Sequence, residues 1–252
     1  MNSVLLRRAL LLPRYKGVAA LHTDKKVMKG AQSQLKECDS IQAAYLLNDQ
    51  CILVDEYDNP IGHASKGDCH HVSTAALHRA FSVFLFTPDQ KLILQKRSAS
   101  KVTFPSVWTN SCCSHPLFVE DEMDTSNNSI GVRRAAQRKL EHEMGIQGLE
   151  LDRMNVMGRF LYKASSDSEW LEHELDYALV VTNFDPALIH PNPEEVADFM
   201  LVDPQKLDSM IKTKRFSPWF ALFNQFNWLN SWWQNLGDLD KLRDMDKIHR
   251  LN

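Results

Sequence analysis

Two glutamates flank a histidine in Glu172-His173-Glu174, directly before the apolar run of residues 177–181. The run is typical of a strand, and residues two apart in a strand project from the same face. Glu172 and Glu174 are therefore expected side by side, where their carboxylates repel each other unless a cation lies between them. The alternative is a solvated sheet face, but the apolar run favours a central strand.

Histidines that could complete a metal site occur in three other places. His70 and His71 lie in a polar segment, His78 precedes an apolar run, and His115 follows two cysteines. Imidazole and carboxylate ligands together suit a first-row divalent metal, and three histidines with two glutamates fill five positions of an octahedral site. A single histidine is more often a hydrogen-bonded loop residue, so the spacing alone leaves both interpretations open.

Cys112 and Cys113 are adjacent in the polar segment that contains Ser111, Ser114 and His115. Neighbouring cysteines rarely form a disulfide because the ring is strained, and most buried thiols are inert. This polar segment has the character of a site loop rather than of a core. A nearby cation or imidazole would allow one of the thiols to exchange protons.

Three basic residues, Lys66, Arg97 and Lys101, are candidates for holding a phosphate or diphosphate. The planar fork of arginine matches phosphate oxygens, and lysine supplies a point charge. Such a cluster is usually a solvated surface. Its position directly before the cysteine-rich loop favours a binding role.

Alternating strands and helices are predicted to position these groups. Strands are predicted at residues 51–54, 81–86, 92–94, 158–163, 172–182 and 199–202. A helix is predicted at residues 130–144, with Asn128 or Ser129 as its N-cap and Gly145 at its C-terminal end. Ser217-Pro218 predicts the start of a last helix that runs through Trp233. The pattern is that of a single α/β or α+β domain.

Composition narrows the class of protein. The 252 residues are 44% hydrophobic and 24% charged, as in soluble globular proteins. No apolar stretch approaches the length of about 18 residues needed to span a membrane. Five cysteines, an odd number, argue against a disulfide framework and for a reducing compartment. The net charge is −3 and the first 23 residues are basic, so the remainder is acidic and a poor partner for nucleic acid.

Four segments are expected along the chain. Residues 1–23 form a basic, acid-free leader that predicts a mitochondrial transit peptide, with a merely basic terminus of a cytoplasmic or peroxisomal protein as the alternative. Residues 24–50 are interpreted as a polar linker with one or two helical turns, 51–235 as the folded domain with a core at 76–226, and 236–252 as a tail. The last three residues match a peroxisomal signal poorly.

Six motifs, together and in order, resemble those of type 1 isopentenyl-diphosphate delta-isomerases of the eukaryotic type. The resemblance covers residues 51–235. The motifs are Leu77-His-Arg-Ala-Phe-Ser-Val-Phe-Leu-Phe86, Thr103-Phe-Pro105, Trp108-Thr-Asn-Ser-Cys-Cys-Ser-His-Pro-Leu117, Val132-Arg-Arg-Ala-Ala-Gln-Arg138, Glu172-His-Glu174 and Ser217-Pro-Trp219.

The resemblance implies a Nudix fold, in which a mixed central sheet is packed between helices. The hydrolase signature of that superfamily is incomplete here. Residues that fit it are Arg138, Leu140, Glu143, Gly145 and Ile146. Lys139 and His142 replace two of its glutamates, and Asp124 and Ile130 stand where its earlier glycine and glutamate belong. A Nudix diphosphohydrolase acting on a nucleotide or isoprenoid diphosphate is therefore the weaker alternative, and a non-catalytic, metal-stabilised binding module is a third.

The resemblance also implies the site residues. The expected metal ligands are His70, His78, His115, Glu172 and Glu174, with Glu143 helping to hold a metal associated with the diphosphate. Mg²⁺ is the expected cofactor, with Mn²⁺ or Zn²⁺ as alternatives at the histidine site. His70 is preferred to His71 because it lies four residues after Lys66, although His71 has the spacing to His78 of the shorter bacterial members. Lys66, Arg97, Lys101 and Ser114 are the expected diphosphate contacts.

The reaction implied by the resemblance moves a double bond in isopentenyl diphosphate to give dimethylallyl diphosphate, in mevalonate-derived isoprenoid and sterol biosynthesis. A proton is added at C4 and another removed from C2, with a tertiary carbocation between the two steps. Cys113 and Glu174 are the expected proton-exchanging groups, in an order left open, and Tyr162 is expected to orient or relay the proton of Glu174. Trp219 is expected to stabilise the cation with its π face. Cys112 has no assigned role, the partner is the small isoprenoid diphosphate, and the protein is expected to be a monomer.

Overall fold

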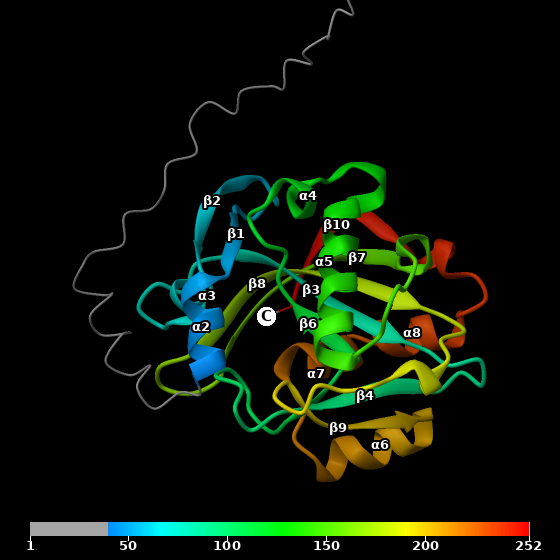
Figure 1. Ribbon diagram of the computed structural model, residues 1–252. Helices are drawn as coiled ribbons and strands as arrows, with labels where there is room; N and C mark the ends of the chain where they lie inside the picture. The colour runs from blue at the N-terminus through cyan, green and yellow to red at the C-terminus, as the bar shows by residue number, and fades with distance from the viewer. Residues whose placement is uncertain (1–39, 252) are drawn as a thin grey trace, which may run out of the picture.

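The protein is described by a computed structural model that covers residues 40–251. Its larger sheet has the strand order β10-β7-β8-β3-β1-β2, and β6 also pairs with β3 (Figure 1). These strands are β1 (Gln50–Val54), β2 (Pro60–Ser65), β3 (His78–Leu85), β6 (Cys112–Ser114), β7 (Asn155–Ser165), β8 (Leu171–Val181) and β10 (Asp244–Arg250). Because β3 and β8 run parallel while β7 and β8 run antiparallel, the sheet is mixed, as predicted.

A second, three-stranded sheet has the order β5-β4-β9. Its strands are β4 (Leu92–Arg97), β5 (Trp108–Thr109) and β9 (Val196–Val202). The return strand predicted at residues 92–94 therefore does not extend the first sheet, and a single bridge between Phe86 and Leu92 links the two strands that the turn connects.

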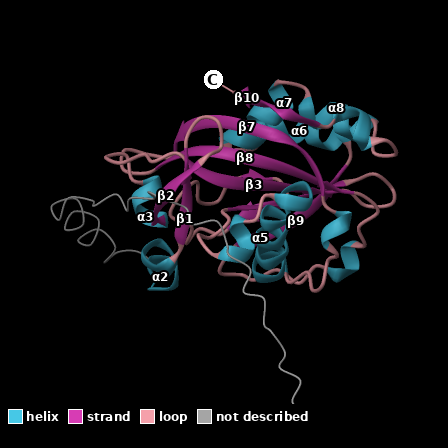
Figure 2. Ribbon diagram, turned by 90° about the horizontal axis from the view of Figure 1, so that it is seen from above, coloured by secondary structure: helices cyan, strands magenta, loops and turns pink. Residues whose placement is uncertain are grey.

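Helices cover both faces of the larger sheet (Figure 2). The helix α5 lies on one side, and α7 and α8 lie on the other. The helices are α2 (Ser40–Asn48), α3 (Lys66–His70), α4 (Glu120–Met123), α5 (Ser126–Met144), α6 (Pro204–Thr213), α7 (Pro218–Gln225) and α8 (Trp228–Gln234), with 3-10 turns at Leu151–Arg153, Pro186–Leu188 and Leu239–Leu242.

The central strand β3 explains this layering. All of its residues are buried. Phe81, Val83 and Leu85 pack in the same cluster as the apolar residues of α5, whereas Phe84 packs with those of α7 and α8. Alternate residues of a strand point to opposite faces, so an unbroken apolar run is what a strand covered on both sides requires.

The helix ends in the structure agree with the predicted ones, with one exception. Asn127, Asn128 and Ser129 have left-handed φ angles, so the regular part of α5 begins where the helix was predicted, and Gly145 ends it with φ 66°. The last predicted helix is instead two helices, because Asn227 has φ 62° and breaks the chain direction between α7 and α8.

Two of the expected segment boundaries need correction. Residues 244–250 of the expected tail form β10, which pairs in parallel with β7, and the backbone N–H of Leu251 donates to Leu161 O at 2.9 Å. Its sequence is mostly charged because an edge strand needs only one apolar face. The last part of the expected linker forms α2, which buries Leu46. The predicted leader lies outside the described residues.

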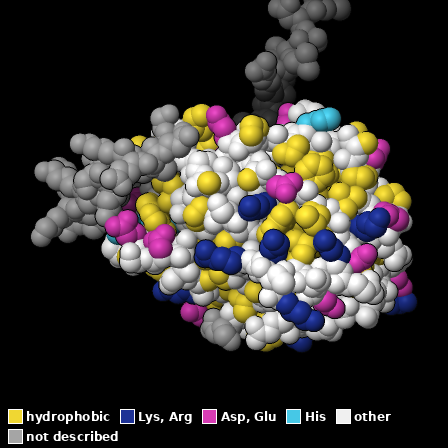
Figure 3. Space-filling view, turned by 90° about the horizontal axis from the view of Figure 1, so that it is seen from below, with side chains coloured by type: hydrophobic (Ala, Val, Ile, Leu, Met, Phe, Trp, Pro, Cys, Tyr) yellow, Lys and Arg dark blue, Asp and Glu magenta, His cyan; other side chains and the backbone are white. Residues whose placement is uncertain are grey.

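None of the helices within residues 40–251 is long and apolar enough to cross a membrane. On the described part of the face in Figure 3, Lys and Arg side chains alternate with hydrophobic and acidic ones. This face has no continuous basic stripe of the kind that follows a nucleic-acid backbone.

Candidate active site

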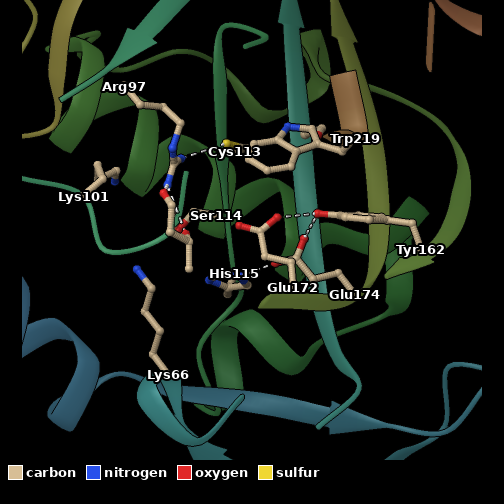
Figure 4. A pocket seen from close by; sticks show the side chains of 12 residues that line it. Lys66, Arg97, Lys101, Cys113, Ser114, His115, Tyr162, Glu172, Glu174 and Trp219 are labelled. Atoms are coloured by element: carbon tan, nitrogen blue, oxygen red, sulfur yellow. Dashed lines mark hydrogen bonds and ion pairs between the residues drawn. The ribbon is translucent and has the colours of Figure 1, made fainter. Parts of the chain in front are cut away.

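A cavity lies beside β3, between the β6 loop, β8 and α7 (Figure 4). It brings together all eight residues predicted for catalysis and diphosphate binding. The lining residues are Lys66, Ser82, Arg97, Lys101, Thr103, Cys113, Ser114, His115, Tyr162, Glu172, Glu174 and Trp219. Residues from widely separated parts of the sequence therefore meet in one cavity.

The register of β3 places the two predicted proton-exchanging groups. Cys113 on β6 pairs with Ser82, and Glu174 on β8 pairs with His78, on the other side of the same strand. Directly paired residues point to the same face of a sheet. Ser82 and His78 are four residues apart, so Cys113 and Glu174 flank β3 at points separated by about 13 Å along it. The cavity occupies the space between them.

Three histidines and one glutamate form a compact group that could hold a metal ion. One potential ligand atom from each of His70, His78, His115 and Glu174 lies within 4.8 Å of the others, and all four residues are buried. Glu174 Oε1 is 3.6 Å from His70 Nε2, 3.6 Å from His78 Nε2 and 2.8 Å from His115 Nε2. His71 is not part of the group, because its Nδ1 bonds with Ser73 and its ring packs on Trp170. The choice of His70 over His71 fits this arrangement.

The hydrogen bonds of the imidazoles favour a cation at this point. His70 Nδ1 lies 2.7 Å from Lys66 O, and His78 Nδ1 lies 2.8 Å from Ala76 O. A carbonyl oxygen only accepts, so each Nδ1 carries a proton and each Nε2 faces the carboxylate. Burial would lower the pKa of His78, but the adjacent Glu174 carboxylate raises it to about 9. His78 Nε2 is buried without a hydrogen-bond partner. Burial lowers the pKa of His70 to about 4 and also lowers that of His115, which keeps these rings neutral. The donor set therefore fits a divalent transition metal or Mg²⁺.

Glu172, which was also expected as a metal ligand, lies beside this group but is not one of its four residues. The hydroxyl of Tyr162 donates to Glu174 Oε2 at 2.5 Å and lies 3.0 Å from Glu172 Oε2. Burial and the charge of Glu174 raise the pKa of Glu172 to about 8. Burial would also raise the pKa of Glu174, but hydrogen bonds from His115, His70 and His78 hold it well below its usual range. One carboxyl of the pair thus keeps its charge while the other holds a proton at neutral pH.

The two adjacent cysteines face opposite sides. The Sγ of Cys113 lies in the cavity, 3.7 Å from Arg97 Nη1. Burial raises the pKa of Cys113 to about 12, although the charge of Arg97 acts in the other direction. Cys112 is fully buried in the core on the α5 side, and its thiol lies 3.6 Å from Glu143 Oε2. Cys113 is therefore a protonated thiol beside the cation that would stabilise its thiolate.

The predicted phosphate-binding residues line one side of the cavity (Figure 4). Arg97 is held firmly, because it donates to Phe104 O at 3.0 Å and to Thr103 O at 2.7 Å. Burial lowers the pKa of Lys66, and the nearby charges of Lys101 and Lys139 lower it further. Like charges packed this closely favour an anion as the missing partner.

Glu143, which was expected to help hold a metal, does not belong to the histidine group. Its Oε1 lies 3.1 Å from Lys139 Nζ and 3.4 Å from Lys101 Nζ, and Lys101 also forms an ion pair with Glu195. Burial would raise the pKa of Glu143, but Lys101, Lys139 and Arg97 lower it. The lysine that replaces a signature glutamate at position 139 thus supplies positive charge where the signature would supply negative charge.

Trp219 closes the cavity opposite Arg97. Its indole Nε1 donates to Asn110 Oδ1 at 2.9 Å, and the edge of Phe104 meets its ring at a centroid distance of 5.5 Å. The guanidinium carbon of Arg97 is 5.7 Å from the ring centroid. Trp232 and Trp233 pack in the core instead.

Two lining residues were not singled out from the sequence, Ser82 and Thr103. Ser82 is the one polar residue within the apolar run of residues 81–86, and its hydroxyl donates to the buried Asp176 at 2.8 Å. A hydroxyl in an otherwise apolar buried strand needs a hydrogen-bond partner, so the serine within this run could have been identified from the sequence as a candidate cavity residue.

Comparisons with known proteins agree with the fold. A model of the NUDIX domain matches residues 76–220. The chain is 46% identical over 228 residues to isopentenyl-diphosphate Delta-isomerase II of Clarkia breweri, covering 84% of this chain and 78% of that protein. It is 45% identical to isopentenyl-diphosphate Delta-isomerase I of Camptotheca acuminata, covering 95% of that protein, and 45% identical to the chloroplastic isopentenyl-diphosphate Delta-isomerase II of Arabidopsis thaliana, covering 79%. The chain therefore belongs to the isopentenyl-diphosphate Delta-isomerase family, within the Nudix superfamily.

Proposed function

We propose that this protein isomerises isopentenyl diphosphate to dimethylallyl diphosphate. The observation that supports this best is the pairing of Cys113 and Glu174 with opposite sides of β3, with one cavity between them. Moving the double bond requires one proton to be added at C4 and another to be removed from C2. Two separate proton-exchanging groups that face one cavity meet that requirement.

We assign the thiol of Cys113 and the carboxyl of Glu174 to the two proton transfers. The Cys113 thiol holds its proton at neutral pH, and Arg97 is placed to stabilise a thiolate once that proton has left. Tyr162 donates to Glu174 Oε2 and so fixes the direction of the carboxylate. The indole of Trp219 offers the electron-rich face that a tertiary carbocation at C3 needs. The buried position of these groups keeps water from capturing the cation.

The diphosphate is proposed to lie against Lys66, Arg97, Lys101 and Ser114. A resident divalent cation, with Mg²⁺ proposed and Mn²⁺ or Zn²⁺ as alternatives, would be held by His70, His78, His115 and Glu174, with Glu172 as a further ligand. Such a cation would fix Glu174 and balance the buried carboxylates. Glu143 is proposed to hold a second cation that arrives with the diphosphate. Lys101 and Lys139 are paired with Glu143 in this structure, and the bound diphosphate would be the anion that draws them away and frees the carboxylate.

Hydrolysis of a diphosphate is not favoured by this arrangement. A Nudix hydrolase uses several signature glutamates to hold its catalytic magnesium, and here the one that remains, Glu143, is paired with Lys139 and Lys101. An assay for released phosphate separates the two activities, because an isomerase releases none.

Compartment and assembly are proposals drawn from the sequence. The basic leader at residues 1–23 supports a mitochondrial location, and fusing these residues to a fluorescent protein would test it. We also propose a monomer, which light scattering would check.

The proposed reaction is tested by incubating the protein with isopentenyl diphosphate and Mg²⁺ in heavy water and following the mixture by ¹H and ³¹P NMR. We expect deuterated dimethylallyl diphosphate and no orthophosphate. Release of phosphate, or no product at all, would refute the proposal.

A further inference from the structure

We infer that Asn110 is a positioning residue that holds the indole of Trp219 and the main chain at Cys113 in fixed relation to each other. The inference rests on the proposed isomerase activity. Asn110 does not line the cavity, and it is fully buried between β5 and β6. It lies in one of the motifs noted in the sequence, but neither catalysis nor binding gives it a role.

The hydrogen bonds of Asn110 define the orientation of its amide. The Nδ2 group donates to Val83 O at 3.1 Å and to Cys112 O at 2.7 Å, and both partners can only accept. Oδ1 accepts from Trp219 Nε1 at 2.9 Å and from Thr109 Oγ1 at 2.8 Å. A flipped amide would lose the bonds to both carbonyls and to the indole N–H, so one orientation is fixed, and in it the full capacity of the side chain is used.

Thr109 and Ser217 extend this network to the start of α7. The single hydroxyl proton of Thr109 goes to Asn110, so in the 2.7 Å contact between Thr109 Oγ1 and Ser217 Oγ the serine must be the donor. Ser217 is the N-cap residue of α7, yet its side chain makes no capping bond to the helix. Its hydroxyl instead ties the helix that carries Trp219 to β5. Thr109 and Ser217 are both fully buried.

The amide of Asn110 therefore contacts both the main chain at Cys113 and the indole of Trp219. The carbonyl of Cys112 belongs to the peptide unit that bears the N–H of Cys113, so Asn110 holds the main chain next to the reactive thiol. Through Oδ1 it also sets the rotation of the indole ring. A cation–π contact weakens when the ring face turns away, and a buried network with every bond made is rigid. Losing this network should raise the barrier of the chemical step without weakening diphosphate binding.

A matched pair of variants isolates the effect. Thr109→Val keeps the shape of the side chain but removes the proton donated to Asn110, and Thr109→Ser keeps the hydroxyl. We expect Thr109→Val to lower kcat about tenfold, as expected for one buried hydrogen bond, with little change in KM for isopentenyl diphosphate. Thr109→Ser should restore most of kcat. Asn110→Ala should show a larger loss in the same parameter.

Binding of a transition-state mimic provides the second measurement. The probe is a diphosphate in which a tertiary ammonium nitrogen replaces C3 of the substrate, and its affinity is measured by calorimetry. Thr109→Val should raise the dissociation constant of this probe by about the same factor by which it lowers kcat, because both quantities depend on how well the site stabilises the cation. In a Trp219→Phe background, which lacks the indole N–H, the same change should have no further effect.

The outcomes separate this inference from the proposed function. An inactive wild-type protein would refute the function. An active wild type together with a Thr109→Val variant of unchanged kcat and unchanged probe affinity would refute the positioning role alone. A Thr109→Val variant that loses only thermal stability, or that weakens probe binding equally in the Trp219→Phe background, would also overturn it.

Discussion

Glu174 and Glu143 are both buried carboxylates near the same cavity, yet they have opposite kinds of neighbours. Glu174 faces the Nε2 atoms of three imidazoles. Glu143 faces the ammonium groups of Lys101 and Lys139. The first site is a set of nitrogen and oxygen donors that fits a metal, whereas the second already contains its counter-ions.

This difference shows how a hydrolase scaffold can be adapted to another reaction. Lysine at position 139 neutralises the region where the Nudix signature would bind magnesium. The histidine group depends on the strand register, since His78 and Glu174 are direct partners across β3 and β8. Variants in one of the two regions can therefore use variants in the other as their control.

The largest effect is expected for Glu174→Gln. The variant loses a proton-exchanging group and a metal ligand together, so turnover should fall by at least about a thousandfold. The deuterium NMR assay measures the loss. Glu143→Gln is the control, and an equal loss in both variants would remove the distinction between the two carboxylates.

Removal of the resident metal should come next. His115→Ala takes away an imidazole whose Nε2 lies 2.8 Å from Glu174 Oε1, and we expect the purified variant to contain much less metal by elemental analysis. Lys139→Met, in the other region, should keep its metal. If His115→Ala retained the wild-type metal content, the proposed ligand set would be wrong.

A smaller and different effect is expected for Glu143→Gln. Its resident metal should remain, but the concentration of Mg²⁺ that gives half-maximal rate should rise about tenfold or more, because the second cation loses its carboxylate ligand. The change should also leave Lys139 without its partner and lower the free energy of unfolding by about 3 kcal/mol. Urea unfolding and a Mg²⁺ titration measure the two effects, and an unchanged Mg²⁺ requirement would contradict the assignment.

The smallest effect is expected for Tyr162→Phe. The variant keeps the ring but loses the hydroxyl that orients Glu174, so kcat should fall about tenfold while the metal content stays the same. A kcat equal to that of the wild type would show that Tyr162 is only a packing residue.

The sequence predicted the parts of the molecule that local chemistry determines. The apolar run at residues 81–86 predicted a doubly covered strand, and Gly145 predicted the end of α5. The family resemblance supplied the residues that meet in the cavity. The pairing of Glu143 with Lys139 follows from their i,i+4 spacing on the predicted helix, but the contact with Lys101 was not predictable because it forms only through the tertiary fold. The same holds for β10, whose charged sequence becomes a strand only because β7 offers an open edge.

The most direct test of this account compares the two adjacent cysteines in the deuterium NMR assay. Cys113 lies in the cavity beside Arg97, and Cys112 points into the core on the other face of the sheet. We expect Cys113→Ala to form no detectable deuterated dimethylallyl diphosphate, and Cys112→Ala to retain most of the wild-type rate. Substantial turnover by Cys113→Ala, or equal losses in both variants, would contradict the assignment of Cys113 to proton transfer.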